Sequence, residues 1–179
     1  MSDALSDLVI ELAGPGDLDA IERLLLREWR TTSMISRGVR HELLKLPAIV
    51  ARVERKLVGL LTFSLTSSEL EIVTLNATTA QAGIGTLLLA AATERARDAG
   101  CERLWLITSN DNLEALRFYQ RRGMRLVALY PGAIDRARAL KPQIPQTGAF
   151  GIPLRDELEL ELDLRAAPGE DRDARAPLD

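Results

Sequence analysis

The sequence has a single cysteine, no excess of basic residues and no long apolar run, and each of these absences excludes a class of protein. Cys101 is the only cysteine among 179 residues, so no intrachain disulfide can form and a cytoplasmic location is expected. The net charge of -3 gives no overall attraction for nucleic acid. No segment reaches the ~20 apolar residues that a membrane-spanning helix needs. The first residues do not have the basic-then-apolar pattern of a secretory signal.

The overall composition fits one compact domain. The chain is 46% hydrophobic and 27% charged, which is ordinary for a soluble globular protein, and 179 residues can bury one substantial core but hardly two. We therefore expect one domain over residues 1–165. Residues 166–179 are polar, charged and proline-containing, and they are predicted to form a disordered tail.

Hydrophobic periodicity predicts a chain that alternates between strands and helices. Strands are predicted at 8–12, 49–53, 57–65, 70–75, 104–108, 126–130 and 158–164, and helices at 17–28, 41–46, 84–99 and 112–122. The stretch 70–108 is a strand-helix-strand unit, so its two strands should be parallel neighbours. The strand at 158–164 alternates Leu with Glu or Asp, which is typical of an antiparallel strand with one wet face. Residues 131–153 hold four prolines and should be mostly irregular, with one helical turn at 134–139. The fold class is then α/β (α+β): a single mixed, mostly antiparallel sheet with helices on both faces.

Two strand-to-helix junctions carry the residues that indicate chemistry. At the first, Gly83-Ile84-Gly85-Thr86 begins a helix, where free N–H groups and the helix dipole favour a phosphate. A Gly-x-Gly pattern alone is explained as well by a tight turn, and neither a third glycine nor Gly-Lys-Ser/Thr follows to make a dinucleotide fingerprint or a P-loop. At the second junction, Asn112 precedes a helix that carries Tyr119 two turns along, although Asn112 is also a good N-cap residue. In this order and spacing, the two junctions predict a nucleotide-bearing cofactor held between them.

The chain from residue 9 to residue 164 resembles the GCN5-related N-acetyltransferase (GNAT) superfamily, whose members transfer an acyl group from acyl-coenzyme A, usually to an amine. The resemblance is carried by Val73-Thr74-Leu75, by Gly83-Ile84-Gly85-Thr86-Leu87-Leu88, and by the block Asn112-x-x-Ala115-x-x-Phe118-Tyr119-x-x-x-Gly123-Met124. It implies a fold in which two parallel strands splay apart around the acyl-pantetheine arm. It also implies acetyl-CoA as the acyl donor, with no metal.

The resemblance implies roles for individual residues. The backbone of Val73 and Leu75 would pair with the pantetheine amides, Asn112 would bond the cofactor arm, and Tyr119 would lie near the sulfur. The pyrophosphate would be held by the amides of Gln81, Ala82, Gly83, Ile84, Gly85 and Thr86. Ala80 stands where the family usually has Arg or Gln, so phosphate binding would depend more on these backbone amides.

The chemistry of acyl transfer assigns roles to the ionisable side chains. The thiolate that leaves needs a proton, and the phenol of Tyr119 is a suitable acid. The attacking amine arrives protonated, and Glu69 and Glu71 lie on one face of a strand beside the expected thioester. Glu71 is the first choice as base, although a solvated strand face explains either carboxylate as well. His41 is expected to have a surface or pocket-lining role.

Two functional hypotheses follow. The first is an N-acetyltransferase that moves the acetyl group directly to a primary amine of a small molecule or peptide in a ternary complex, without a covalent enzyme intermediate, because no activated Cys or Ser is present. The second is a non-catalytic, coenzyme A-binding or regulatory module. Neither nucleic acid nor a membrane is expected as a partner, and a homodimer that uses the strand at 158–164 as an edge remains open. Arginines at positions 30, 37 and 40, and the cations Arg136, Arg138 and Lys141, are either substrate ligands or solvated loop residues.

Overall fold

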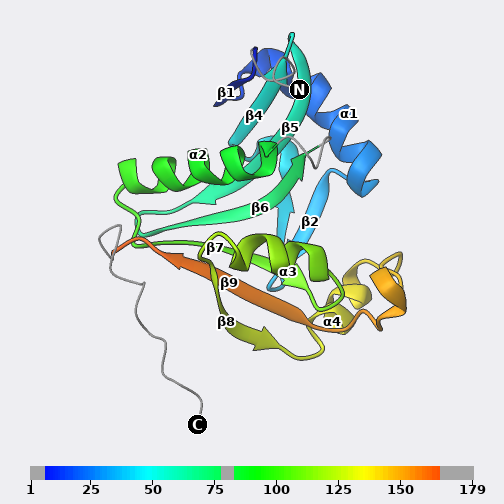
Figure 1. Ribbon diagram of the computed structural model, residues 1–179. Helices are drawn as coiled ribbons and strands as arrows, with labels where there is room; N and C mark the ends of the chain where they lie inside the picture. Colours follow the sequence, from blue (N-terminus) through cyan, green and yellow to red (C-terminus); the bar gives the residue numbers. More distant parts are fainter. Residues whose placement is uncertain (1–6, 78–82, 166–179) are drawn as a thin grey trace.

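The computed structural model describes residues 7–77 and 83–165, and it shows a large sheet with helices on both faces (Figure 1). The sheet has the strand order β1-β4-β5-β6-β7-β9-β8, and a separate two-stranded sheet pairs β2 with β3. Its strands are β1 (Val9–Leu12), β4 (Ala48–Val53), β5 (Lys56–Leu65), β6 (Glu69–Ala77), β7 (Arg103–Ser109), β8 (Arg125–Tyr130) and β9 (Glu157–Asp163). The helices are α1 (Leu18–Trp29), α2 (Ile84–Asp98), α3 (Leu113–Gln120) and α4 (Ala133–Leu140), with 3-10 turns η1 (Pro15–Asp17), η2 (Leu43–Lys45) and η4 (Ala149–Gly151).

Each face of the large sheet has its own hydrophobic core. On one face, α2 and α3 bury residues such as Leu88 and Tyr119 against the inward side chains of the central strands. On the other face, α1 places Ile21, Leu24 and Leu25 at helical spacing against β4 and β5. The predicted fold class, a mixed and mostly antiparallel sheet with helices on both faces, is therefore confirmed.

The parallel pair β6 and β7 separates halfway along its length. The two strands are in register from Glu69 opposite Arg103 to Ile72 opposite Leu106, and there the pairing ends. Both strands continue beyond that point, to Ala77 and Ser109. On the other edge of β6, the register with β5 shifts so that Val73 is passed over, a bulge that bends the strand. The bulge and the end of pairing open a gap in the middle of the sheet.

The segment after α1 differs from the prediction. Instead of a polar connection and a helix at 41–46, the chain forms a hairpin of β2 (Ser33–Ser36) and β3 (Val39–Glu42), and only η2 is helical. Arg37 and Gly38 form the two-residue turn, with φ of 49° and 75°. A residue followed by glycine between two short strands is the usual composition of such a turn, so this signal was present in the sequence.

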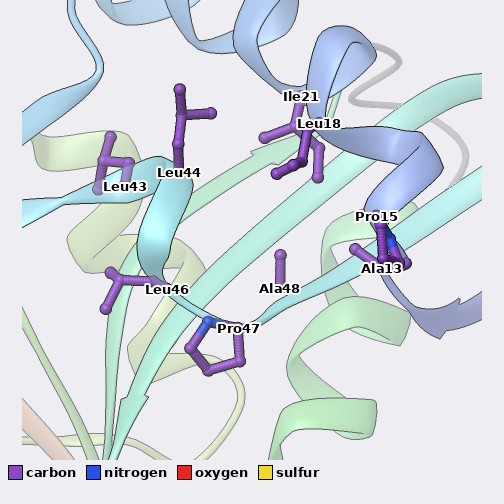
Figure 2. A pocket seen from close by; sticks show the side chains of 10 residues that line it. Ala13, Pro15, Leu18, Ile21, Leu43, Leu44, Leu46, Pro47 and Ala48 are labelled. Carbon is purple, nitrogen blue, oxygen red and sulfur yellow. The ribbon is translucent and has the colours of Figure 1, made fainter.

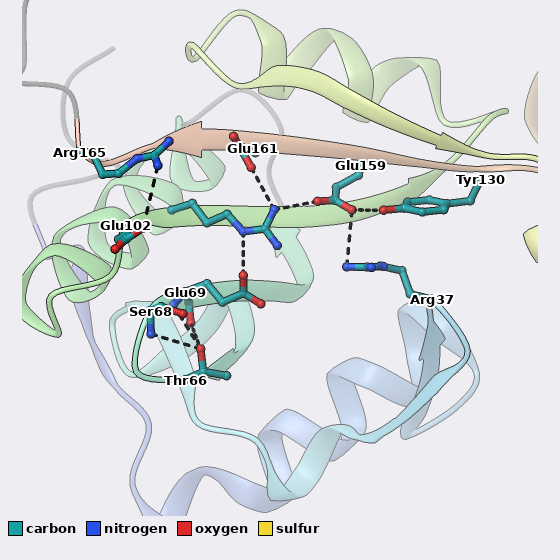
Figure 3. A network of polar contacts seen from close by, with 10 residues as sticks. Arg37, Thr66, Ser68, Glu69, Glu102, Tyr130, Glu159, Glu161 and Arg165 are labelled. Atoms are coloured by element: carbon teal, nitrogen blue, oxygen red, sulfur yellow. Dashed lines mark hydrogen bonds and ion pairs between the residues drawn. The ribbon is translucent and has the colours of Figure 1, made fainter.

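Strand β9 is antiparallel as predicted, but it lies inside the sheet between β7 and β8 and does not form an edge. Its acidic face is not fully wet either, because Glu159 is only 4% exposed. The reason lies in contacts from other elements, because Arg103 of β7 and Arg37 of the β2–β3 turn reach Glu159, and Tyr130 donates its hydroxyl to the same carboxylate. Figure 3 shows Arg37 and Tyr130 directed at Glu159. Cations from other elements cover charges that the local pattern alone would place in water.

Two remaining predictions concern the C-terminal tail and the segment 131–153. In the segment 131–153 one helical turn was predicted, and the structure has the two-turn helix α4. The predicted tail at 166–179 lies outside the described residues. Over residues 7–77 and 83–165, no helix combines the length and the apolar character needed to cross a bilayer.

Candidate active site

A cavity of about 730 Å³ lies where β6 and β7 separate. Val73 of β6 and the last three residues of β7 form part of its wall, together with Asn112 at the start of α3. The rest of the wall comes from the end of α1, from β2, and from α4 with the segment that follows it. The apolar part of the lining includes Met34, Val73, Ile107, Ile134, Ile144 and Leu154. A mostly apolar cavity of this size with a few polar groups is typical of a small-molecule site.

The junction between β7 and α3 joins this cavity to the segment after α4. Asn112 is the N-cap of α3, since its Oδ1 accepts from the Ala115 N–H at 3.3 Å. The two preceding residues do not cap the helix. The Asn110 side chain hydrogen-bonds to the backbone at 153–156, and the Asp111 carboxylate accepts from the Ala149 N–H at 2.7 Å. Asn112 therefore serves as the cap and also lines the cavity, and its bond to the cofactor arm stays a prediction.

The predicted phosphate site at the start of α2 is partly described. Gly85 packs closely on α3, because a Cβ there would lie 3.2 Å from the Phe118 ring, which is tighter than an ordinary contact. Arg122, which the sequence reasoning missed, stacks on that ring at 3.6 Å and its Nε donates to Thr86 Oγ1 at 2.9 Å. A cation is thus fixed on the first turn of α2, while Gln81 and Ala82 lie outside the described residues.

Arg138 fixes the segment that walls the cavity after α4. Its guanidinium donates to the carbonyl oxygens of Ile144, Pro145 and Leu154, at 2.8–3.0 Å. Its Nη1 donates to Asp135 Oδ1 at 2.6 Å, so four of its five N–H donors are used and its charge is paired, and Arg138 positions the wall rather than binding a substrate.

Asp111 also holds the segment after α4, through the Ala149 N–H, and this contact gives a testable prediction at Gly148. A Cβ at this position would lie 2.9 Å from the Asp111 Cβ and still closer to the Asp111 carboxylate, which holds the Ala149 N–H. We expect Gly148→Ala to lower the free energy of unfolding by about 1–3 kcal/mol, as overpacking does. Denaturant titration measures this change. Gly16→Ala, where a Cβ meets nothing within 4 Å, is the matched control, and equal midpoints for the two variants would contradict the prediction.

Glu157 is a carboxylate on the cavity wall, and the sequence reasoning missed it. It is only 6% exposed, and its Oε2 accepts from the Arg37 N–H at 3.2 Å. Burial raises the pKa of Glu157 above its usual value of 4.5, against smaller lowering effects of the Arg37 N–H and of the Arg136 and Arg37 charges, and the negative charge of Glu71 adds a still smaller raising effect. A buried carboxylate with a raised pKa is the property that a general base at neutral pH requires. The sequence signal for Glu157 was its position two residues before Glu159, on the same face of the strand, but that face was predicted to be exposed to solvent.

The two carboxylates predicted as bases lie beside the cavity lining and not in it. Glu71 is buried under the β2–β3 hairpin, where Ser36 Oγ donates to its Oε1 at 2.9 Å and His41 Nε2 lies 3.7 Å from its Oε2. Burial raises the pKa of Glu71 as well. Glu69 accepts from Arg103 Nε at 2.7 Å and is held in an ion pair. His41 is thus a buried neighbour of Glu71.

Tyr119 lies in the core between α3 and the sheet. It is 8% exposed, packs edge-on against Phe118 at 5.0 Å, and is absent from the cavity lining in the described residues. Burial raises the pKa of its phenol far above 10, so the hydroxyl stays protonated at neutral pH. Leu75 packs on the same core and meets the start of α2 at Gly85.

A second cavity, of about 240 Å³, lies between α1 and the start of β4 (Figure 2). Its lining is apolar, with Leu18, Ile21, Leu43 and Pro47 among the residues that face it. Within the described residues it presents no acid, base or nucleophile, so the larger cavity is the candidate active site. Likewise, no group of three or more His, Cys, Asp and Glu in the described part of the chain could hold a metal ion.

The fold is a mixed sheet with a gap between two parallel strands, and comparison with known sequences gives the family. The sequence model of the acetyltransferase (GNAT) family matches residues 18–124. The chain therefore belongs to the GNAT acetyltransferase family. Two curated relatives from Bacillus subtilis strain 168 are each 42% identical: the uncharacterized protein YdhI over 58% of this chain and 64% of its own length, and the uncharacterized protein YxbD over 63% and 70%.

Solved structures support the fold assignment. The IAA acetyltransferase of Bacillus cereus has a TM-score of 0.68 at 24% identity, covering 88% of this chain and 99% of that one. A GNAT family acetyltransferase from Elizabethkingia anophelis with acetyl-CoA bound has a TM-score of 0.61 at 18% identity, covering 89% and 99%. A Bacillus subtilis acetyltransferase in complex with CoA has a TM-score of 0.61 at 21% identity, covering 88% and 99%.

Proposed function

We propose that this protein is an acetyl-CoA-dependent N-acetyltransferase that transfers the acetyl group directly to a primary amine. The observation that carries the proposal is the cavity at the separation of β6 and β7, which brings together the Val73 bulge, the capped start of α3 and the buried carboxylate of Glu157. A non-catalytic coenzyme A-binding module would need the gap but not a carboxylate of raised pKa inside it. The cytoplasmic location stays a prediction based on the single cysteine.

The residues of the gap fit the acyl donor. Beyond Ile72, β6 no longer pairs with β7, so the backbone groups of Val73 and Leu75 are available to the pantetheine amides. The cap of α3 uses Asn112 Oδ1, and an amide side chain keeps its Nδ2 as a donor for the same arm. Gly83, Ile84, Gly85 and Thr86 begin α2, and Arg122 beside Thr86 adds a positive charge for the phosphates that position 80 does not supply.

The bound donor supplies a thioester, and the side chains move the protons. Glu157 takes a proton from the ammonium of the acceptor and releases it to solvent, which frees the nitrogen lone pair to attack the acetyl carbonyl carbon. As the new C–N bond forms, the nitrogen gives its second proton to Glu157. As the C–S bond breaks, Tyr119, whose ring lies in the core outside the described cavity lining, gives its proton to the leaving sulfur and regains one from solvent. Glu71 raises the pKa of Glu157 through its charge, and it is the alternative base.

Calorimetric titration with acetyl-CoA tests the proposal, with NAD as the comparator. We expect micromolar affinity for acetyl-CoA, no binding of NAD, and weaker acetyl-CoA binding in Arg122→Gln by about tenfold, since one charged phosphate contact is lost. Arg55→Gln, in the exposed turn between β4 and β5, is the matched control. Absence of acetyl-CoA binding would overturn the proposal, whereas binding without acetyl transfer to any amine would favour the non-catalytic module.

A further inference from the structure

Lys141, which lines the large cavity, is a cation whose hydrogen-bond partners are neutral. Its Nζ donates to Thr31 Oγ1 at 3.3 Å and to the Ser33 carbonyl oxygen at 3.2 Å. In the described part of the chain, no carboxylate lies within ion-pair distance of this ammonium. Burial lowers the pKa of Lys141, and the positive charge of Arg40 lowers it further. A partly buried ammonium that is hydrogen-bonded only to neutral groups would be stabilised by a nearby anion.

The cavity therefore presents two groups of opposite charge to one ligand. Glu157 and Ala137 both line this cavity, and Lys141 follows Ala137 by one helical turn, with its N–H bonded to the Ala137 carbonyl oxygen at 2.9 Å. The wall also includes apolar side chains such as Ile134, Ile144 and Leu154. A ligand that contacts both charged groups would carry an amine for Glu157, an anion for Lys141 and an apolar surface for the rest of the wall.

We infer that the acceptor is an amine that also carries a carboxylate, with Lys141 binding the carboxylate while Glu157 receives the proton of the amine. This inference rests on the proposed acetyl transfer and names the substrate class for it. Arg30, which also lines the cavity, adds positive charge for the same carboxylate.

The two charged groups of the cavity come from different elements, since Glu157 begins β9 and Lys141 follows the last residue of α4. An extended dipeptide keeps its amine and its carboxylate about 7 Å apart. A dipeptide and an ω-amino acid of similar length are therefore suitable acceptors for testing the two groups separately.

Two other cations near Glu157 are less suited to this role. A smaller cavity of about 360 Å³, which shares Glu157 with the large one, is lined by Arg37 and Arg136. Arg37 already pairs with Glu159 and lies between the rings of Trp105 and Tyr130. Arg136 donates to the Pro131 carbonyl oxygen and is exposed. Lys141 and Arg30, by contrast, line the large cavity and lack a fixed acidic partner among the residues described.

The experiment compares a free carboxylate with its amide in otherwise identical acceptors. Release of coenzyme A from acetyl-CoA is followed with alanyl-leucine and alanyl-leucinamide, and with 6-aminohexanoate and hexylamine. We expect kcat/KM for each carboxylate to exceed that of its neutral partner by about tenfold or more, because a charge-assisted contact is gained. Equal values for the members of both pairs would overturn the inference.

Lys141→Gln tests the assignment to this side chain, because glutamine keeps a polar, hydrogen-bonding group and loses only the charge. We expect it to lower kcat/KM for alanyl-leucine to the level of the amide, with unchanged kcat/KM for the amide and unchanged affinity for acetyl-CoA. Lys56→Gln, at the exposed first residue of β5, is the matched control. Equal losses for acid and amide, weaker acetyl-CoA binding, or loss of the preference in Arg136→Gln but not in Lys141→Gln would each overturn the assignment.

A protein that binds acetyl-CoA but shows no turnover would contradict the proposed function and leave a separate test of the inference. Calorimetry with alanyl-leucine and alanyl-leucinamide, in the presence of coenzyme A, then measures recognition alone. Tighter binding of the acid that disappears in Lys141→Gln would support the carboxylate site. Absence of binding by the acid, or equal binding of acid and amide, would overturn it.

Discussion

Glu157→Gln is expected to reduce kcat for acetyl transfer by ~10²–10⁴-fold, the usual contribution of a general base. Glutamine keeps an oxygen to accept the Arg37 N–H, so the local structure should persist and the affinity for acetyl-CoA should not change. In the wild-type protein kcat/KM should rise with pH as the Glu157 carboxyl loses its proton, with an inflection above 4.5 because burial raises its pKa. Steady-state kinetics across pH measure both effects, and the variant should lack this inflection.

Glu71→Gln is the matched control, since it also neutralises a buried carboxylate of raised pKa. Loss of the Glu71 charge lowers the pKa of Glu157, so the inflection should move to lower pH while kcat at neutral pH falls much less than in Glu157→Gln. If Glu71→Gln abolished transfer and Glu157→Gln did not, Glu71 would be the base, as the sequence alone suggested.

The same carboxylate should also reveal itself in stability. The pKa of Glu157 is higher in the folded protein than its unfolded value of 4.5, so the folded state retains this proton to higher pH. Its stabilising contribution is complete below the unfolded pKa and is lost as pH rises through the folded pKa. Glu157→Gln stays neutral and avoids that loss, so we expect its thermal midpoint at neutral pH to exceed that of the wild type.

Tyr119→Phe should slow acetyl transfer by roughly 10²-fold or more while the affinity for acetyl-CoA changes little, because only the proton donor is removed. The ring stays in the core, and its contact with Phe118 can persist. Burial keeps the phenol protonated at neutral pH, which is the state that a general acid needs. Single-turnover kinetics and calorimetry separate the two quantities.

Tyr130→Phe provides the comparison, since it removes a hydroxyl that donates to Glu159 outside the core. It should leave the transfer rate within a few-fold of the wild type. Equal losses of rate and of acetyl-CoA affinity in Tyr119→Phe would assign the phenol to cofactor binding. An unchanged rate would remove Tyr119 from the mechanism.

Local patterns accounted for most of the secondary structure and for one half of the site. Apolar spacing predicted α1, α2 and α3 and the central strands, because helix and strand periods are set by neighbouring residues. The strand-helix-strand unit predicted the parallel pair, and the block that starts at Asn112 predicted a second junction facing it. The β2–β3 hairpin was missed because its strands have only four residues each and are largely polar.

The sequence by itself determined the family, the alternation of strands and helices, and the two junctions that begin α2 and α3, because these depend on short-range spacing and on glycine and amide residues at fixed positions. The tertiary structure decided which carboxylate meets the cavity. Glu157, Glu159 and Glu71 appear alike as acidic residues on alternating strands, and only contacts with β2–β3 and α4 distinguish them. Burial and its effect on a pKa come from distant segments that pack together, so no local pattern could assign the base or bring Lys141 to the same cavity.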